Sequence, residues 1–330
     1  GWYISNEAFW GEPMKNIVNK LKLKATYGLV GNDEIGSPSD RFFYISEVNM
    51  QAGNKGAHFG TKRNEYYNGV SISRYPNDQI TWETAKKLNL GIELGVCDQL
   101  EIQADVFWEK RENILMDRAY IPSTMGLQAT VKANVGEAKS RGIDISASYN
   151  KFFGKDAWLT GMANFTYATN EYVVFEEADY SATPWKSHIG QAIHQQYGYI
   201  AERLFVDDEE VRNSPTQFGG SKLRAGDIKY KDINGDGKIT ELDQVPLGYP
   251  TVPEITYGFG LSGGYKSFDL SFFFQGLGRE SFWINASSTA PFIGNQRELL
   301  KAYADDHWTE ENQNLYALWP RYDYEANDNN

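Results

Sequence analysis

Hydrophobic and polar residues alternate one by one along several stretches of this chain. In the segment LKLKATYGLV, Leu21 and Leu23 fall on one face, and Lys22 and Lys24 fall on the other. A period of two is the pattern of a β-strand whose faces meet different surroundings. The same pattern recurs at 87–96, 100–109, 142–149, 159–170 and 254–275. It predicts a chain built mainly of antiparallel strands.

The second face of these strands is small or polar. The polar positions that we expect to line an enclosed interior are Lys22, Lys24, Glu101, Gln103, Asp105, Asp144 and Asn164. The strands run for about ten residues, longer than the usual five or six. Strands of this length, apolar at every second position, are long enough to cross a bilayer.

The predicted connections fall into two classes of length. Short turns are expected at 97–99, at about 150–157 and at 266–267, where Lys266 and Ser267 would close a hairpin. Long connections are expected at 31–80, 114–136 and 172–254. One end with short turns and another with long loops is typical of transmembrane β-barrels. The aromatic residues near strand ends, expected to form interfacial girdles, are Tyr27, Trp82, Trp108, Tyr149, Trp158 and Tyr265.

We therefore predict an all-β membrane protein. Residues 1–330 would form part of one transmembrane antiparallel β-barrel domain, with short periplasmic turns and long extracellular loops. Alternation alone leaves a large soluble β-sandwich or jelly roll open, because a sandwich also has one buried and one wet face.

Composition narrows the classes of function. The 330 residues carry a formal net charge of −12, which argues against nucleic acid as a partner because phosphates require a basic surface. Cys97 is the single cysteine, so neither an internal disulfide nor a cysteine-based metal site is expected. Residues 1–10 lack the pattern of a signal peptide. The sequence also ends in a polar segment, EANDNN. From these two observations we expect a fragment of a longer protein.

The segment 232–243, DINGDGKITELD, has the spelling of a twelve-residue calcium loop. Such a loop places oxygen ligands at positions 1, 3, 5, 7, 9 and 12 and a glycine at position 6. Those ligands would be Asp232, Asn234, Asp236, Lys238 (through its carbonyl), Thr240 and Asp243. Prolines downstream and an alternating stretch upstream predict no flanking helices, so the loop would stabilise a long irregular connection. Position 12 is Asp243 where Glu is usual, which removes one ligand oxygen, so we expect weak Ca²⁺ binding. The alternative is a loop that turns the chain through Asn and Asp side chains without metal.

Several motifs of enzymes match by spelling alone. GxGxxG at 258–263 and GxSxG at 260–264 need a strand followed by a helix, whereas here the strand pattern continues. The four histidines, His58, His188, His194 and His307, form no ligand-type pair, and the sequons at Asn164 and Asn285 carry little weight. We predict no catalytic residues.

Four segments together resemble the SusC/RagA-type TonB-linked transporters of the outer membrane. They are YPNDQITWETAKKLNLGIEL (75–94), NVGEAKSRGIDISASY (134–149), the block 225–276 around the calcium-type loop, and DDHWTEENQN (305–314). The block 225–276 is the most specific of them. The resemblance covers most of the chain.

This resemblance implies a barrel of about 22 strands closed by an N-terminal plug. It implies an outer membrane of the Bacteroidota type, import of oligosaccharides or peptides, and a SusD-like lipoprotein lid. It also implies energy supplied by the TonB complex. The plug, the TonB box and the final strands are not among these residues, so we expect TonB to act through a part outside this sequence. No ligand-contacting residue can be carried over from the family pattern.

The function expected from the sequence is nutrient import through the barrel of a SusC-like transporter. Loop aromatics with faces suited to sugar rings are Tyr180, Trp185, Tyr197 and Tyr199, although such residues often only anchor loops. The alternative is a secreted, calcium-stabilised β-sandwich that binds glycans. A secreted glycoside hydrolase built of β-strands is the third hypothesis.

Overall fold

The computed structural model describes residues 1–34, 42–285, 291 and 298–323. Contacts between residues divide the chain into two compact units. Unit 1 comprises Gly1–Asp179, His188–Ile193 and Val252–Glu280, and unit 2 comprises Tyr180–Ser187, His194–Thr251 and Ser281–Asn330.

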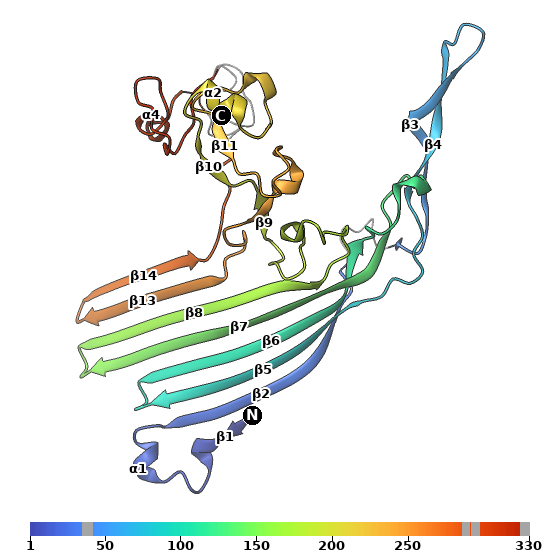
Figure 1. Ribbon diagram of the computed structural model, residues 1–330. Coiled ribbons are helices and arrows are strands. Elements are labelled where there is room, and N and C mark those ends of the chain that lie inside the picture. Colours follow the sequence, from blue (N-terminus) through green and yellow to red (C-terminus); the bar gives the residue numbers. More distant parts are fainter. Residues whose placement is uncertain (35–41, 286–290, 292–297, 324–330) are drawn as a thin grey trace. The chain divides into compact units, whose positions relative to one another are not determined.

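Unit 1 is built on one antiparallel sheet of eight strands. Its spatial order is β1 (Trp2–Tyr3), β2 (Lys20–Asn32), β5 (Glu83–Val96), β6 (Leu100–Asp117), β7 (Lys132–Phe153), β8 (Ala157–Val174), β13 (Ile255–Tyr265) and β14 (Phe268–Gly278). Consecutive strands are neighbours in space, which is the arrangement of an up-and-down meander (Figure 1). Most of these strands are longer than predicted, because pairing continues past the alternating segments.

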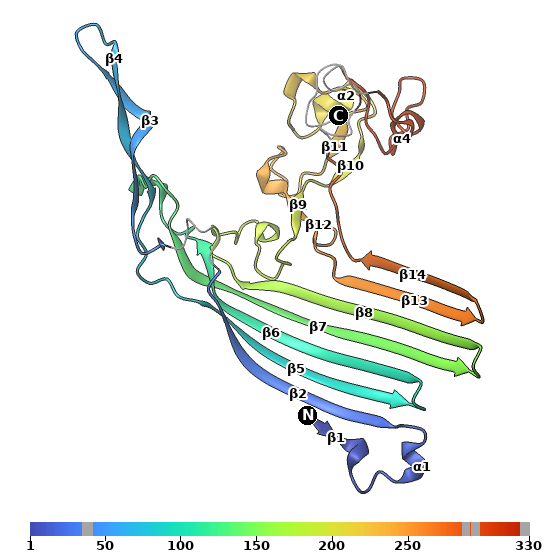
Figure 2. The same ribbon diagram turned by 180° about the vertical axis from the view of Figure 1, so that it is seen from behind.

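Tight turns join the strands at one end of this sheet (Figure 2). The turns at 97–99 and 266–267 are confirmed, and Cys97, Asp98 and Lys266 adopt the left-handed conformation with φ of 54°. The turn predicted at 150–157 is narrower, 154–156, because Phe153 still pairs with Ala157. Short helical turns η1 (Ile4–Asn6) and α1 (Glu12–Lys15) separate β1 from β2.

The connections at the other end are long, as predicted, but two of them, 31–80 and 172–254, contain further strands. The stretch 31–80 contains a hairpin of β3 (Glu47–Phe59) and β4 (Glu65–Arg74). The connection between β6 and β7 covers 118–131 and includes η3 (Ser123–Met125). The ion pair between Arg118 Nε and Glu176 Oε2, 2.7 Å, ties it to the segment after β8. Burial raises the pKa of Glu176, but hydrogen bonds from Arg118 and the Tyr120 amide outweigh it and lower that pKa below its usual value.

Unit 2 consists of short elements. Two small sheets pair β9 (Gln196–Gly198) with β12 (Val245–Leu247) and β10 (Ala201–Leu204) with β11 (Ile228–Tyr230). The helical elements are η4 (Pro184–Lys186), α2 (Asp208–Asn213), η5 (Gly220–Lys222), η6 (Glu241–Asp243) and α4 (Lys301–Asp305). Leu204, Trp308 and Ala317 form the core, with Ala225 and Ile228 against it. No helix in the described ranges is long and apolar enough to cross a membrane.

The large eight-stranded sheet has an apolar face that no second protein layer covers within the described residues. Paired residues extend its apolar positions across the strands, for example Leu90 beside Val106 and then Ile143. Leu90 is 44% exposed and Phe272 is 42% exposed, values expected for contact with something other than this chain. Trp158 was expected in a girdle, but it lies on the opposite face, paired with Phe152 and Gly264, so that prediction is wrong.

Candidate functional site: the polar face of the sheet and the loop 232–243

The polar face of the sheet collects the side chains that the alternation assigned to an interior. Strand pairing places Lys22 beside Glu93 and then Gln103, and Lys24 beside Gly91 and then Asp105. The same rows continue through Asp144, whose carboxylate accepts a 2.9 Å hydrogen bond from the Thr166 hydroxyl, and through Asn164. All the predicted interior positions therefore share one face.

Ion pairs cross this face from strand to strand. Glu93 accepts from Lys20 at 3.1 Å and from Lys22 at 3.2 Å. Lys24 reaches Asp105 at 3.2 Å, although β5 lies between their two strands. A Cβ on Gly91 would stand 2.1 Å from Asp105 Oδ1, so glycine leaves open the space in which this pair forms. The lysines and carboxylates form a continuous hydrophilic wall.

The wall continues toward the long connections with a second set of pairs. Lys87 contacts Glu109 at 3.2 Å, and Arg111 contacts Glu109 at 2.7 Å. Apolar side chains also occur on this face, among them Phe107 and Phe273. The face is polar on balance and mixed in charge, and it can present both donors and acceptors to a hydrated solute.

The loop 232–243 is closed by hydrogen bonds of its own. Both carboxylate oxygens of Asp232 accept backbone amides, from Gly235 and Gly237. Asp243 is fully buried and accepts the amides of Ile233 at 3.0 Å and Thr240 at 2.8 Å. Ile239 is buried as well, which pins the loop to unit 2. The absence of flanking helices is confirmed, since β11 precedes the loop and β12 follows it, and the short turn η6 lies within its last three residues.

These residues fit a calcium ion only in part. In the described portion of the chain, no group of three or more His, Cys, Asp or Glu side chains is arranged to hold a metal. The carboxylate of Asp243, expected at position 12, is engaged with backbone amides. The oxygens of Asp232, Asn234 and Asp236 accept amides within the turn, and residues 235–238 are exposed.

The loop aromatics are engaged in local packing. Trp185 Nε1 donates to the Leu242 carbonyl at 2.8 Å, and the Tyr197 hydroxyl donates to the Ser187 carbonyl at 2.8 Å. Tyr199 packs edge-on against Phe218 with centroids 4.9 Å apart. These contacts hold loop segments of unit 2 together. The two enzyme-like glycine motifs lie inside β13, which runs into the hairpin with β14 without an intervening helix.

An ion cluster that sequence reasoning missed joins α2 to the small sheet of unit 2. Glu210 Oε1 lies 2.5 Å from Arg203 Nη2 and 2.9 Å from Lys229 Nζ, and its other oxygen accepts the Val206 amide at 2.9 Å. The hydrogen bond with Arg203, with help from Val206 and Lys229, lowers the pKa of Glu210 to about 2. The sequence signal is faint, because the three charged partners are 7 and 19 residues apart.

We expect the Glu210 cluster to weaken in acid. The pKa of this carboxylate is lowered on folding, so its stabilisation is complete above about pH 4.5 and is lost as pH falls toward 2. Glu210→Gln should cost about 2 kcal/mol of local stability at neutral pH, since hydrogen bonds to charged groups contribute about 1.5–3 kcal/mol. Hydrogen exchange of the β10 and β11 amides, corrected for intrinsic rates, measures this loss. The exposed neighbour Glu209→Gln is the matched control, and equal losses in the two variants would contradict the assignment.

Comparisons with known proteins place this geometry in context. A family model described as "TonB dependent receptor-like, beta-barrel" matches residues 37–323. TonB-dependent receptor P3 of Formosa agariphila is 29% identical over 287 residues, covering 83% of this chain and 27% of that protein. TonB-dependent receptor P26 of the same organism is 26% identical over 328 residues, covering 94% and 30%. The chain thus spans under a third of the curated relatives it matches.

A solved structure described as the RagAB peptide transporter superposes with a TM-score of 0.65 at 21% identity. The match covers 99% of this chain and 34% of that one. A second structure, the RagAB peptide importer in its closed-closed state, gives a TM-score of 0.65 at 20% identity, with 99% and 34% covered. At these identities the likeness is one of fold.

Proposed function

Because the chain belongs to the family of TonB-dependent receptor-like β-barrels, we propose that it forms part of the wall of an outer-membrane importer of the SusC/RagA type. The observation that carries the proposal is the contrast between the two faces of one sheet. One face is apolar and exposed, and the other carries a network of lysines and carboxylates.

The role of each face follows from the surroundings that suit its side chains. Lipid offers no hydrogen-bond partners, so backbone groups must pair between strands, as they do here over eight strands. The apolar face then contacts acyl chains. The polar face borders the interior, where a hydrated solute or another segment of the same protein meets lysines and carboxylates.

Oligosaccharides or peptides are the proposed cargo. Both are polar, flexible molecules with many hydrogen-bonding groups, and the mixed polar face can serve donors and acceptors alike. The partners that we propose are a SusD-like surface lipoprotein on the long-loop side and the TonB complex acting outside the residues described. RagAB is a peptide transporter, and the likeness of this chain to it supports the peptide class by fold alone.

Uptake by cells tests the proposal. Deleting the gene that encodes this chain should abolish growth on one class of polymer, glycan or peptide, and the intact gene should restore it. The protein should be extracted from the outer membrane only with detergent, and a surface lipoprotein should copurify with it. A protein that dissolves in buffer and binds glycans without detergent would instead support the secreted β-sandwich, and glycosidic hydrolysis would support the enzyme hypothesis.

We also propose that the loop 232–243 binds calcium weakly, a proposal supported by its spelling. We expect a dissociation constant on the order of 10⁻⁴–10⁻³ M, as in extracellular modules. Calorimetric titration of the intact protein with CaCl₂ should show this binding, and Asp236→Asn should weaken it severalfold. Glu241→Gln, an exposed change in the same loop outside the ligand positions, serves as the control. Equal heats for both variants and the parent would contradict the proposal.

A further inference from the structure

The apolar face of unit 1 ends abruptly in a row of cations. Tyr27, Leu88 and Trp108 are consecutive cross-strand neighbours, and one step further along the strands the row contains Lys86, Lys110 and Lys139. Arg141 lies directly beside Trp108. We propose that this basic cluster (Lys86, Lys110, Lys139 and Arg141) binds the phosphorylated headgroup of a glycolipid in the outer leaflet. The inference rests on the proposed membrane setting of the barrel.

The arrangement of the lysines is unfavourable for the sheet by itself. Lys86 pairs with Lys110 in the register of β5 and β6, and Lys110 pairs with Lys139 in the register of β6 and β7. Like charges directly opposite each other on neighbouring strands are destabilising. Three such residues in one row therefore call for anions, and the row stands on the face that contacts lipid.

The protein supplies only part of the required negative charge. Glu112 contacts Lys86 at 2.7 Å and Lys110 at 2.9 Å, Glu137 contacts Lys110 at 2.9 Å, and Glu171 contacts Lys139 at 2.7 Å. Three carboxylates thus face four cations, and Arg141 has no carboxylate partner among the described residues. The lysine side chains are 42–57% exposed, so these ion pairs are weak and the ammonium groups stay open to another anion.

The order of the charges along the strands suits a headgroup that approaches from the membrane side. Leu88 and Trp108 lie nearest the apolar belt, the basic cluster follows, and Glu112 and Glu137 come beyond it. A phosphate at the depth of the tryptophan would meet Arg141 first, one step before the row in which Lys139 pairs with Glu171. Guanidinium groups bind phosphate through two parallel hydrogen bonds, which makes Arg141 the expected anchor.

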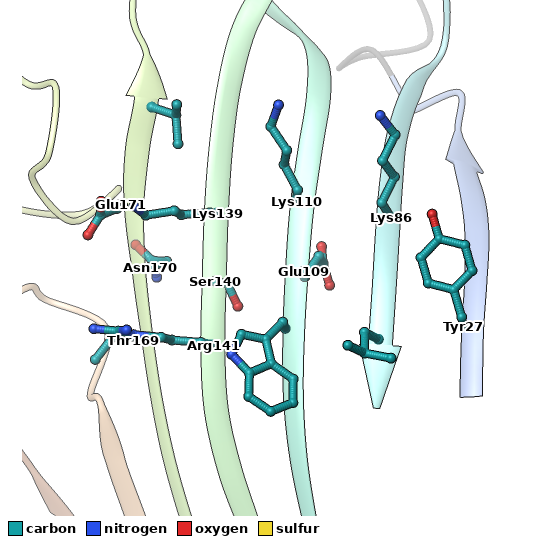
Figure 3. Close-up of a pocket in the computed structure, with 13 residues that line it drawn as sticks. Tyr27, Lys86, Glu109, Lys110, Lys139, Ser140, Arg141, Thr169, Asn170 and Glu171 are labelled. Atoms are coloured by element: carbon teal, nitrogen blue, oxygen red, sulfur yellow. Dashed lines mark ion pairs between the residues drawn. The ribbon is translucent and has the colours of Figure 1, made fainter. Parts of the chain in front are cut away.

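The surface at this point is hollowed. A groove of about 470 Å³ is lined by the basic cluster together with Tyr27, Leu88 and Trp108 (Figure 3). Lys86 and Lys110 extend along the strands, whereas Lys139 and Arg141 are directed toward Glu171 and Thr169 of β8. Apolar and aromatic side chains beside a group of cations match an acylated, phosphorylated sugar. A free phosphate would use the cations alone, so we commit to the lipid.

Binding of lipid A to the intact protein in detergent tests the proposal. The triple variant Lys110→Gln, Lys139→Gln, Arg141→Gln should bind lipid A more weakly in native mass spectrometry, by roughly fivefold for each charge removed. Lipid A stripped of its phosphates should bind the parent protein as weakly as intact lipid A binds the variant. Added salt should reduce the difference, because exposed charges are screened.

Lys87→Gln is the matched control. Lys87 lies next to Lys86 in the chain but on the polar face, where it pairs with Glu109, so its loss should leave lipid A binding unchanged. Equal binding by the triple variant and the parent would overturn the proposal, as would equal binding of the dephosphorylated lipid or full displacement by inorganic phosphate. A parent protein that fails to enter membranes at all would contradict the proposed function instead.

Discussion

Ile145→Arg should lower the free energy of unfolding from lipid vesicles by about 2–4 kcal/mol, the cost of arginine near the midplane on the lipid face of a barrel. Ile145 lies on the apolar face of β7, between Ala104 of β6 and Phe165 of β8. On this strand the outward charged residues nearest to Ile145 are Arg141 and Lys151, and Ile145 stands near the middle of the apolar interval between them. The guanidinium there has no route to water along its own strand.

Ser146→Arg provides the matched control, because it adds the same side chain one residue away on the polar face. Ser146 pairs with Gln103 and Asn164, in surroundings that already hold charges. We expect this change to alter the unfolding free energy by less than about 1 kcal/mol, as for surface substitutions. Urea titration of the two variants in the same vesicles measures the difference. Equal losses would mean that the two faces do not differ in solvent, contrary to the account.

Asp227→Ala should destabilise unit 2 by about 3–5 kcal/mol, because it removes the buried counter-ion of Arg321 and leaves that arginine only the more exposed Asp323. Asp227 is fully buried and contacts Arg321 Nε at 2.7 Å, and its carboxylate also accepts the Arg224 amide at 3.0 Å. Burial raises the pKa of Asp227 in spite of these partners. The backbone carbonyl of Asp227 accepts a hydrogen bond from the amide of Phe205, whose side chain is almost fully buried. The pair therefore joins the chain near 205 to the segment at 321.

Hydrogen exchange at the Phe205 and Gly226 amides reports this loss in the intact protein. These amides bond to Asp227 and Phe205 respectively, so exchange should accelerate by roughly 10³-fold for a loss of about 4 kcal/mol. Asp323→Asn, which removes the second and more exposed partner of Arg321, should change exchange far less. The double change Asp227→Leu with Arg321→Met should recover much of the protection, since neither charge of the buried pair remains. If the double variant loses as much protection as Asp227→Ala does, the charge pair is not the cause of the stability.

The alternation of apolar and polar residues predicts most of the large sheet. In a run such as 100–109 the two faces meet different surroundings, so a shift of one residue in strand register would move every side chain to the wrong face. For that reason the sequence predicts that Ile102 pairs with apolar residues, as it does with Leu94 and Ala147. The polar positions from Lys22 to Asn164 share the other face. Trp158 was misassigned because an aromatic residue near a strand end is also suited to the inner face.

Other elements left no such signal. The β3–β4 hairpin has both faces exposed and its register shifts at three points, so its sequence lacks a steady period of two. The strands of unit 2 are only three or four residues long, too short for periodicity to register. Asp243 was read as a calcium ligand from its place in a motif, and only the structure shows that backbone amides of its own loop already engage it. The pairing of Asp227 with Arg321 joins positions 94 residues apart and is invisible to local patterns.

The direction in which the apolar side chains point is measured most directly by a spin-label scan of β6 in bilayers. Cys97, the single cysteine, would first be changed to serine, and cysteine would then be placed in turn at each residue from Ile102 to Phe107 of the intact protein. The account predicts that labels at Ile102, Ala104 and Val106 collide with oxygen dissolved in lipid. Labels at Gln103, Asp105 and Phe107 should instead respond to a water-soluble nickel complex, giving a period of two. Shielding of Ile102 and Val106 from both reagents would place them beneath protein and would contradict the account.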